Sequence, residues 1–539
     1  MAEEFRVFGP PGTGKTTNLT EWAQRGVEVF GASQVSVCSL TRAAVREAAG
    51  RDLGLADESV TTLHARCKRA LNAGPPAEER IEDFLRDKPG WVGETPRKQL
   101  HKKPEDDEEG ETAPESRLSG RGDLAFNRMV LYRQQLLPKE KWDRTARDLH
   151  TDWSLWCAQN GTMDYTGWLE ACQDGGILPP QQVVLVDEAQ DHTPLQMRVL
   201  RNWQTKRLAL FGDDDQSLYE WSGAKPEEFF LPELPKGKER VLAQSYRVPR
   251  AVHRVAARVS ARIRTRREKE YLPRGEEGEV AVLQAPWVGA PPWRGMSEAD
   301  QRRYAEEHKE AIRDTLLPQI SPTGRTMILS TCGYHLDPIL SELRAWKVSY
   351  HNPYRRTNTK WNPLGVALET LTAFQDGTRG LRRENISLWA GRVRKDVFFK
   401  ASKRRLDEVL QGSGELLPAE VAGIFTEEGE RLARRGDLNE FMGSLPLVQS
   451  LRWDEALRVL RRGGMRPDII VGTIHSVKGG EADTVIVLPY LSPAGAADWD
   501  AQSDRVFRLI YVAVTRARQR LVLIQDPSGG PQISWEGLV

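Results

Sequence analysis

Short apolar runs that end in polar residues recur along the chain, and they predict buried parallel strands. Val183 to Val186 is such a run, and it is followed directly by an acidic cluster that begins at Asp187. Arg207 to Phe211 is a second run, followed by Gly212 and three aspartates. Strands covered on both faces lack the alternation of half-buried strands, so continuous apolar runs fit a parallel sheet. The same pattern predicts strands at 5–8, 279–284, 326–331, 468–474, 484–488 and 521–525, and alternation of apolar and polar residues predicts one at 34–40.

Helical spacing fills the intervals between these runs. It predicts helices at 18–24 and 41–49 and a strand-to-helix transition across 59–71. Two longer stretches, 72–176 and 355–464, have helical spacing without strand runs, so we interpret them as inserted helical regions. The fold class predicted is therefore α/β, with two sheets that are each interrupted by a mainly helical insertion.

Composition narrows the class of protein. The chain has 539 residues, of which 39% are hydrophobic and 28% are charged, as expected for a multidomain globular protein. No apolar run approaches the roughly 20 residues needed to span a bilayer, so we expect no membrane association. The five scattered cysteines form no Cys-x-x-Cys pair, and the acidic beginning lacks a signal region, which favours a cytoplasmic location and argues against zinc or iron–sulfur sites. With a net charge of +1, any surface that binds nucleic acid must be local.

A phosphate-binding loop follows the first apolar run. Gly9 to Thr16 has the spacing G-x-x-x-x-G-K-[ST], which predicts a loop whose backbone N–H groups surround phosphate oxygens. Glycines permit the tight turn, and the positive end of the following helix faces the same anion. Lys15 then reaches the outer phosphates and Thr16 holds Mg²⁺. The alternative is a glycine-rich loop that only turns the chain.

Two acidic clusters at strand ends suggest a metal–nucleotide site, because ligands of open α/β sheets bind at the carboxyl edge. In this hypothesis Asp187 helps to hold Mg²⁺, Glu188 orients or deprotonates the attacking water, and Gln216 senses the γ-phosphate. The alternative is ordinary strand-end capping, which a single cluster without a phosphate loop would favour.

Eight motifs in order resemble those of the UvrD/Rep/PcrA group of superfamily 1 helicases, over nearly the whole chain. Each motif alone is of limited specificity, whereas the ordered set is specific. The motifs are Gly9–Thr16, Ser39–Ala44, Thr62–His64, Val186–Asp191 with Pro194–Gln196, Gly212–Ala224, Gln244–Arg247, Gly472–Glu481 and Tyr511–Ala517.

The resemblance implies two RecA-like P-loop motor domains, each interrupted by a helical subdomain. The implied first motor comprises 1–71 and 177–240, and its insertion comprises 72–176 with a mobile acidic loop at about 101–117. The implied second motor comprises 241–354 and 465–539, interrupted by the basic helical insertion 355–464.

The resemblance also implies an ATP site between the motors. Gly12, Thr13, Gly14, Lys15, Thr16 and Thr17 would bind phosphate, with Thr16 and Asp187 holding Mg²⁺ and Glu188 acting as general base. Gln216 resembles the γ-phosphate sensor, and Arg247 and Arg516 resemble the arginines that contact the γ-phosphate from the second motor. Tyr246 resembles the residue that stacks on adenine, and Glu481 the residue that bonds the ribose.

For DNA, the resemblance implies contacts with single strands and with junctions of single- and double-stranded DNA. Trp221 and Tyr219 resemble aromatic residues that stack on bases, and the alternative for Trp221 is a core aromatic. The other implied strand contacts are Thr41, Arg42, Thr62, His64 and His475.

The function implied is ATP-driven 3′→5′ translocation on single-stranded DNA with duplex unwinding. An alternative is an ATPase that displaces bound proteins without processive unwinding, and a small-molecule kinase or ATPase would lack stimulation by DNA. The cellular pathway and any protein partner stay undefined.

The sequence departs from the pattern of this family at several positions. Only Met1 to Phe8 precede the phosphate loop, which leaves no room for the glutamine motif that reads adenine, so selectivity for ATP is not predicted. Ser222 replaces a frequent arginine and Leu40 a frequent phenylalanine, which weakens the expected strand contacts. Gly480 replaces a usual leucine, a tolerable change, and the end soon after Asp526 leaves no room for C-terminal modules.

One feature is independent of the resemblance. Arg250, Arg254, Arg258 and Arg262 recur at intervals of four, which places them on one helix face. The face could follow a phosphate backbone, with binding that weakens as salt rises, or it could be a solvated surface.

Overall fold

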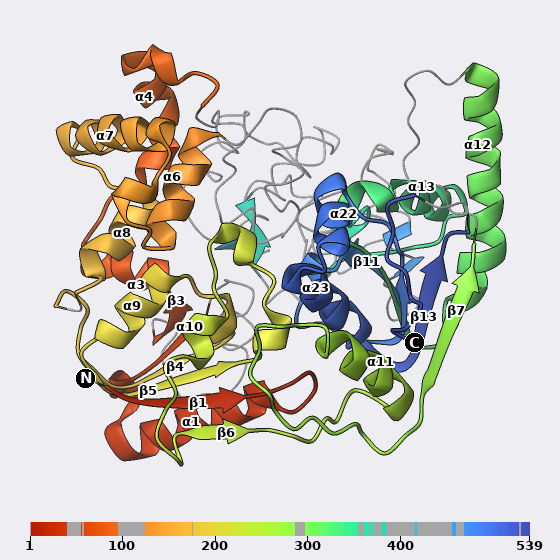
Figure 1. The fold of residues 1–539 in the computed structure, drawn as a ribbon, viewed down its shortest axis with the longest axis horizontal. Helices are drawn as coiled ribbons and strands as arrows, with labels where there is room; N and C mark the ends of the chain where they lie inside the picture. Colours follow the sequence, from red (N-terminus) through yellow and green to blue (C-terminus); the bar gives the residue numbers. More distant parts are fainter. Residues whose placement is uncertain are drawn as a thin grey trace, which may run out of the picture. The chain divides into compact units, whose positions relative to one another are not determined.

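A computed structural model describes residues 2–39, 59–94, 124–174, 176–285, 297–353, 468–527 and 530–539, together with residue 55 and short pieces between 361 and 459 (Figure 1). The chain divides into two compact units. The first contains Met1–Gly295, Leu329–His335 and Thr473–Val539, and the second contains Met296–Ile328 and Leu336–Gly472. All of the residues discussed below as a site belong to the first unit.

A six-stranded sheet with the order β3-β2-β4-β5-β1-β6 forms the core of the N-terminal half. All five neighbouring pairs are parallel, as the continuous apolar runs predict. The strands are β1 (Glu3–Phe8), β2 (Val35–Ser39), β3 (Val60–Thr62), β4 (Gln181–Val186), β5 (Thr205–Gly212) and β6 (Glu239–Val241).

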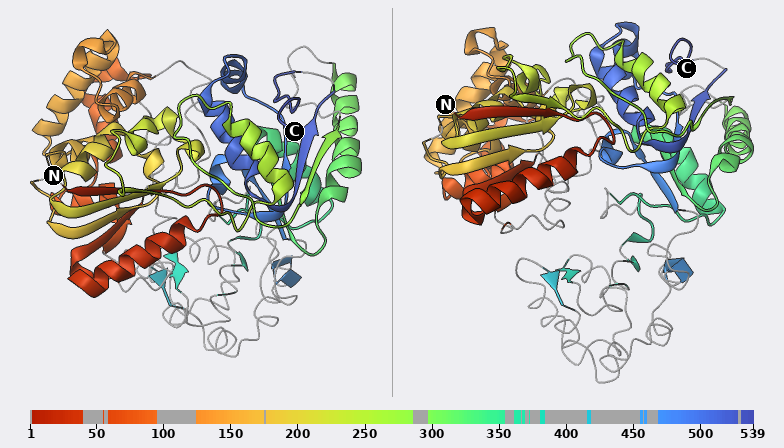
Figure 2. Two further views of the ribbon diagram at one scale, coloured as in Figure 1. Left: turned by 60° about the horizontal axis from the view of Figure 1, so that its bottom comes forward. Right: turned by 90° about the horizontal axis from the view of Figure 1, so that it is seen from below.

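Helices cover both faces of this sheet, and β4 shows how the sequence divides between them. Val183 and Leu185 pack on the α1 face with Leu19 and Ala23, whereas Val184 and Val186 pack in the core of the opposite face. Both views in Figure 2 show α1, in red, on one side of the strands and the orange helices on the other. The helices are α1 (Lys15–Phe30), α3 (Leu63–Ala70), α9 (Pro194–Asn202) and α10 (Glu227–Phe230).

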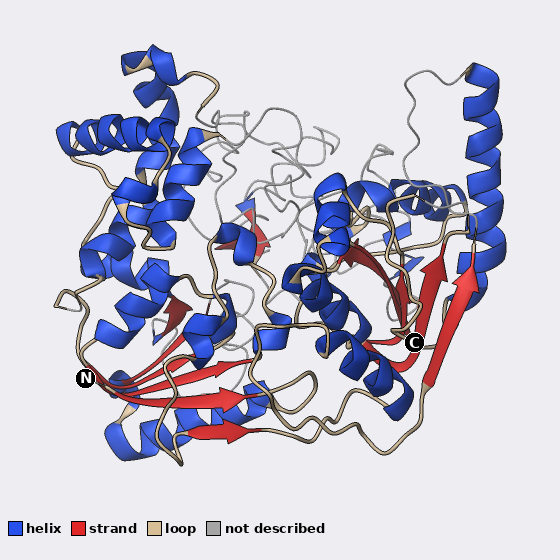
Figure 3. Cartoon of the chain, in the orientation of Figure 1, coloured by secondary structure: helices blue, strands red, loops and turns tan. Residues whose placement is uncertain are grey.

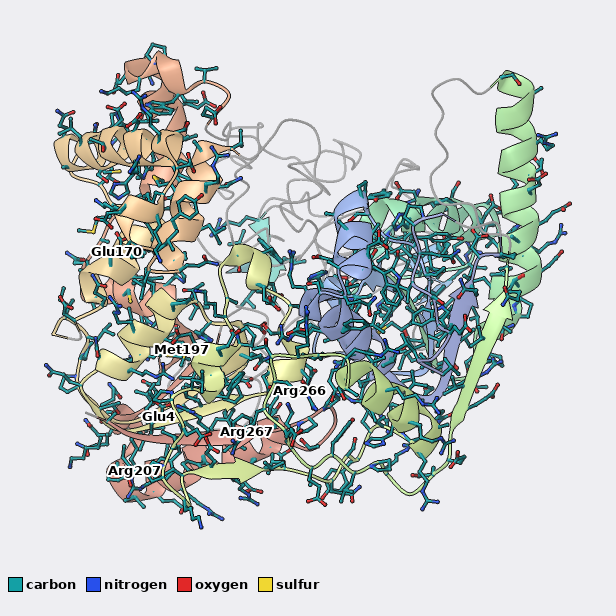
Figure 4. All side chains as sticks on the ribbon, viewed as in Figure 1. Glu4, Glu170, Met197, Arg207, Arg266 and Arg267 are labelled. Carbon is teal, nitrogen blue, oxygen red and sulfur yellow. The ribbon has the colours of Figure 1, made fainter. Side chains whose placement is uncertain are left out.

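A helical insertion separates β3 from β4, and its described part contains helices and loops only (Figure 3). It has its own core, in which Phe84 and Phe126 pack edge-on against Trp153. Arg133 pairs with Asp164 and with Glu170 of α8, a residue labelled in Figure 4. The helices are α4 (Ile81–Asp87), α6 (Ala125–Gln134), α7 (Arg144–Gln159) and α8 (Tyr165–Cys172).

A second sheet has five strands in the order β11-β8-β12-β13-β7. The pairs β12–β13 and β13–β7 are parallel. The strands are β7 (Glu279–Gln284), β8 (Arg325–Ser330), β11 (Asp468–Thr473), β12 (Ala482–Val487) and β13 (Ala517–Gln525). The helices α11 (Arg250–Ser260), α22 (Pro493–Asp500) and α23 (Asp504–Val514) also belong to the first unit.

The described residues of the second unit include the α-helices α12 (Glu298–Ala311) and α13 (Asp337–Ala345). Its described residues also include a two-stranded antiparallel sheet of β9 (Leu381–Arg382) and β10 (Glu415–Leu416).

The α/β class predicted from the sequence is confirmed, with two sheets and parallel pairing. Every predicted strand is present within one to four residues of its predicted bounds, because apolar runs mark strands that are covered on both faces. Helix α1 is longer than the predicted 18–24, since Gly14 begins it in the left-handed region and Gly31, at φ 83°, ends it. The sequence analysis missed β6, an edge strand whose polar residues Glu239 and Arg240 carry no apolar run.

Several predictions lie outside the described residues. They are the helix at 41–49, the acidic loop at 101–117 and nearly all of the basic insertion at 355–464. The contacts of Leu40, Thr41 and Arg42 lie outside as well.

Candidate functional site

The phosphate-loop motif connects β1 to α1 in a tight turn. The Gly9 N–H donates to the Gly212 carbonyl at 2.9 Å, which holds the loop at the carboxyl ends of β1 and β5. Gly12 and Gly14 have φ values of 75° and 80°, a region that side chains rarely adopt. Thr13 closes the turn, because its hydroxyl donates to the Pro10 carbonyl at 2.8 Å. Since Gly14 has no side chain to cap α1, the first N–H groups of the helix are available to an anion.

Lys15 lies opposite the acidic cluster that follows β4. Its Nζ is 3.6 Å from Oε2 of Glu188, and Nζ of Lys478 is 3.7 Å from the same oxygen. Glu188 itself has a φ of 50°, an unusual backbone conformation for a residue with a side chain. Burial raises the pKa of Glu188, but Lys15 and then Lys478 outweigh it and bring this pKa down to about 2. Glu188 is therefore an ionised carboxylate between two lysines.

Asp187 is fixed by backbone contacts at the end of β4. Its N–H donates to the Cys38 carbonyl at 2.9 Å, and its carboxylate accepts the Glu188 N–H at 3.0 Å. Of the two predicted Mg²⁺ ligands, Thr16 lies in the first turn of α1 and Asp187 at the carboxyl edge of the same sheet. Thr17, next to Thr16, is exposed.

A chain of hydrogen bonds joins the two acidic strand ends to Arg516. The Gln190 amide donates to Glu188 at 2.5 Å, and its oxygen accepts the Asp213 N–H at 3.0 Å. Asp213 in turn accepts the Gln216 amide at 2.7 Å, and the Gln216 oxygen accepts an N–H of Arg516 at 2.9 Å. The structure thus brings the predicted γ-phosphate sensor into contact with one of the two predicted arginines.

The other predicted arginine, Arg247, also lies beside the phosphate loop. A Cβ on Gly12 would overlap the Arg247 Cβ and come within 2.8 Å of Ser245 Oγ. Ser245 donates to the Pro11 carbonyl at 2.8 Å, and the Tyr246 N–H donates to the Gly12 carbonyl at 2.8 Å. This close packing explains why residue 12 is a glycine.

Glu481 joins the same group of side chains. Arg247 Nε donates to it at 2.6 Å and Arg518 Nη1 at 2.8 Å. Burial alone would raise the pKa of Glu481, but Arg247 and then Arg518 outweigh burial and bring this pKa below its usual value. The carboxylate is therefore ionised. The Tyr246 side chain is 72% exposed, which leaves its ring accessible to a planar ligand.

The residues predicted to contact DNA include an aromatic pair and several polar residues. Tyr219 and Trp221 lie together, with ring centroids 6.0 Å apart, and the Trp221 Nε1 is buried without a hydrogen-bond partner. The Ser222 hydroxyl, which stands where the family often has arginine, donates to the Tyr219 carbonyl at 2.8 Å. Thr62 caps α3 by accepting the Ala65 N–H at 3.3 Å.

The two predicted histidines sit at element ends. His64 is near the beginning of α3, where burial lowers its pKa to about 4. His475 begins a short 3₁₀ turn after β11.

Four residues of the candidate site were not predicted from the sequence. Lys478 forms ion pairs with Glu188 and Asp191, and its Nζ lies 5.5 Å from the Tyr219 ring centre. Gln190, Asp191 and Lys478 all lie within the quoted motifs, so the motifs themselves were the available signal. Lys269 carries no such signal, yet it contacts all three aspartates at 213–215, at 2.7–3.1 Å.

This acidic trio is therefore already neutralised by protein cations. Arg266, labelled in Figure 4 on the segment after α11, makes a two-pronged contact with Asp215 at 2.6 and 2.8 Å. The Arg267 N–H donates to Asp214 at 2.6 Å. Glu188 of the first cluster lies 3.6 Å from Lys15 of the phosphate loop, whereas the carboxylates of the second cluster pair with Lys269 and Arg266.

The arginines at intervals of four lie on α11 and just beyond it. Its valines at 252, 255 and 259 are buried, and the four arginines are exposed. Arg254 pairs with Glu277 at 2.5 Å, so part of the face is neutralised. A role in following a phosphate backbone stays a prediction.

The residues around the loop suit a nucleotide with bound Mg²⁺. Lys15, Lys478, Arg247 and Arg516 are cations around the loop, and a Cβ on Gly14 would meet nothing within 4 Å. Among the residues that the structure describes, no group of three or more His, Cys, Asp or Glu side chains could hold a metal ion. Mg²⁺ commonly takes only one or two carboxylates and completes its shell with phosphate and water, so this donor set fits.

Two family models match segments toward the two ends of the chain. Residues 2–222 match the family described as "AAA domain", and residues 468–524 match the "UvrD-like helicase C-terminal domain". "Putative ATP-dependent DNA helicase YjcD" of Bacillus subtilis (strain 168) is 24% identical over 602 residues, covering 96% of this chain and 76% of that protein.

Two further relatives match over shorter segments. DNA helicase II of Escherichia coli (strain K12) is 33% identical over 135 residues, which cover 24% of this chain and 18% of that protein. ATP-dependent DNA helicase Rep of Buchnera aphidicola subsp. Schizaphis graminum is 40% identical over 68 residues, 12% of this chain and 10% of that protein. Together with the two sheets and the phosphate loop, these matches support the resemblance of the chain to the UvrD/Rep-like helicases.

Proposed function

We propose that the chain is an ATP-dependent DNA helicase that moves 3′→5′ on single-stranded DNA and unwinds duplex ahead of it. The observation that carries this proposal is the hydrogen-bonded chain from Glu188 through Gln190, Asp213 and Gln216 to Arg516. It connects a nucleotide-type loop to residues that lie three hundred positions away. The direction of movement is supported by the UvrD/Rep-like family.

In this proposal the phosphate loop binds ATP. The backbone of Gly12, Thr13 and Gly14 and the side chains of Lys15 and Thr17 bind phosphate oxygens, while Thr16 and Asp187 would hold Mg²⁺. The cation would neutralise charge on the phosphates during their transfer. Tyr246 stacks on the base and Glu481 bonds the ribose, after Arg247 has exchanged its contact with Glu481 for the γ-phosphate.

Glu188 serves as the general base for the attacking water. In the absence of phosphate, Lys15 and Lys478 keep its pKa near 2, which makes it a weak base. Once phosphate oxygens engage Lys15, this attraction is divided and burial acts more strongly on the carboxylate.

Arg247 and Arg516 stabilise negative charge that spreads over the transferred phosphoryl oxygens. Gln216 contacts Arg516 and lies five residues before Trp221, so it is placed to report nucleotide state to the DNA contacts. Tyr219 and Trp221 stack on bases irrespective of sequence, which suits a motor. We also propose strand contacts by Thr41, Arg42, Thr62, His64 and His475, at single strands and at junctions with duplex.

The domain boundaries given above for the two motors and their insertions are part of the proposal. A cytoplasmic location is supported by five cysteines that are all free, four of them buried. No helix among the described residues has the length and apolar character needed to cross a membrane.

Strand displacement tests the proposal on duplexes with a single-stranded tail at either the 3′ or the 5′ end. We expect ATP-dependent release of the short strand from the 3′-tailed duplex and little release from the 5′-tailed one. Translocation on single strands without any strand release would contradict unwinding. Preference for the 5′ tail would contradict the direction.

A further inference from the structure

Arg508 is a buried cation in the middle of α23 that the proposed reaction does not use. Its side chain is 2% exposed. Nη1 donates to Glu220 at 2.5 Å, Nε to the Asp214 carbonyl at 3.1 Å and Nη2 to the Thr265 carbonyl at 2.5 Å. Of these acceptors only Glu220 carries a charge, so it is the group that balances the buried guanidinium.

Two of these acceptors belong to residues 213–223, which we call the aromatic loop. The loop begins with the buried aspartates, includes Gln216 and ends with Tyr219, Trp221 and Gly223. Glu220 stands between the two aromatic residues, in the 3₁₀ turn Glu220–Ser222. Any displacement of Glu220 therefore displaces both rings.

Helix α23 holds this loop at two places. Arg508 lies within the helix and contacts Glu220, and Arg516, two residues after its last residue Val514, contacts Gln216. Arg516 Nε also donates to the Val512 carbonyl at 2.9 Å, so both arginines are attached to the same helix. Movement of Arg516 toward a phosphate would pull Gln216, and the same movement of α23 would pull Glu220.

We propose that Arg508 is a positioning residue that couples the nucleotide site to the aromatic loop through its ion pair with Glu220. The inference rests on the proposed function, because it assigns the aromatic pair to DNA and Arg516 to phosphate. Gln216 senses the nucleotide directly, whereas Arg508 makes the aromatic pair follow the movement of α23.

The test measures the coupling between nucleotide and DNA binding. The dissociation constant for a fluorescent oligothymidine is determined with and without a non-hydrolysable ATP analogue, and the ratio of the two constants is the coupling factor. Glu220→Gln removes the charge and keeps the shape, and it leaves Arg508 with its two carbonyl acceptors. Glu220→Asp keeps the charge. Arg520→Gln is the matched control, since it removes the pair between β13 and Glu279 of β7, at 2.9 Å, which involves no residue of the aromatic loop.

Coupling factors between ligand sites typically lie at about 5–150. We expect a wild-type factor of about 10, a factor below about 3 for Glu220→Gln, and values near wild type for Glu220→Asp and Arg520→Gln. Because coupling is reciprocal, the effect of DNA on the affinity for the analogue should fall by the same ratio. A merely structural role would weaken both affinities and leave the factor unchanged.

The outcomes separate the two levels of the account. An unchanged factor in Glu220→Gln, with both ligands still bound, overturns the role of Arg508 and leaves the proposed function standing. A wild-type chain that binds DNA with the same affinity whether or not the analogue is present overturns the proposed function, and the inference with it.

Discussion

At the scale of single residues, the site consists of opposite charges held close together in the absence of a ligand. Lys15 and Lys478 flank Glu188, Arg247 and Arg518 flank Glu481, and Lys269 neutralises the aspartates after β5. The contacts of Lys269 are fully buried, and breaking such a pair leaves an uncompensated charge, which costs about 3–5 kcal/mol. Ligand binding must therefore exchange these contacts for others rather than simply fill space.

Lys15 is the residue whose loss should separate hydrolysis from strand binding. Lys15→Ala removes the cation that reaches the phosphates, so we expect ATP hydrolysis to fall by at least about a hundredfold. Binding of single-stranded DNA should change by less than about threefold, because none of the proposed strand contacts involves Lys15. Steady-state hydrolysis and fluorescence anisotropy measure the two quantities. Hydrolysis by the variant near the wild-type rate would refute the site.

Buried histidines should make the fold sensitive to mild acid. Burial lowers the pKa of His192 to about 4, against about 6.5 in the unfolded chain. Above pH 6.5 both states are neutral, and as the pH falls toward 4 only the unfolded state gains the proton. The stability contributed by the neutral imidazole is thus lost between pH 6.5 and 4, on the order of 1–2 kcal/mol at pH 5.

His192→Gln removes this titration. In paired scanning calorimetry, we expect the thermal unfolding midpoint to fall less for the variant than for the wild type between pH 7.5 and pH 5. Since every other titrating group is shared, the difference between the two drops belongs to His192. Equal drops would contradict a depressed pKa.

At the scale of elements, the phosphate loop and the end of α1 each contain a glycine with a left-handed backbone, but the surroundings of the two glycines differ. Gly12 and Gly31 both have positive φ, at 75° and 83°. A Cβ at residue 12 would overlap Arg247, whereas a Cβ at residue 31 would meet nothing within 4 Å.

Gly12→Ala should therefore impair nucleotide binding, and Gly31→Ala should not. Both variants bear backbone strain of about 1–2 kcal/mol, so their thermal unfolding midpoints should fall by similar amounts. Only Gly12→Ala should also raise the dissociation constant of a fluorescent ATP analogue, by about tenfold or more, because Arg247 and Ser245 must move. Equal affinities in the two variants would contradict the close approach of Arg247 to the loop.

Strands could be predicted from the sequence where other elements cover both of their faces. Val183 to Val186 and Arg207 to Phe211 could be recognised because strands buried on both faces are apolar throughout. Glu239–Val241 could not, since an edge strand of three residues needs no apolar run. The acidic ends after β4 and β5 were also predictable in position. The sequence did not show that only the cluster after β5 is paired with Lys269 and Arg266, because these two residues lie more than fifty residues further along the chain.

At the scale of the whole molecule, contacts between distant segments create the site. Lys478 and Asp191 are 287 residues apart in sequence, and Arg516 and Gln216 are 300 apart. Motif order indicated that these segments belong to one site, but no local pattern shows which side chains pair. Pairing depends on how the second sheet presents its loops, and that is a property of tertiary structure rather than of periodicity.

In the proposed mechanism, the rate of nucleotide hydrolysis at this loop depends on a bound DNA strand. Steady-state ATP hydrolysis with Mg²⁺, measured with and without an oligothymidine of defined length, tests it most directly. We predict a stimulation of about tenfold or more by the single strand, absent in Lys15→Ala. An ATPase rate that is unaffected by saturating single-stranded DNA would contradict the claim.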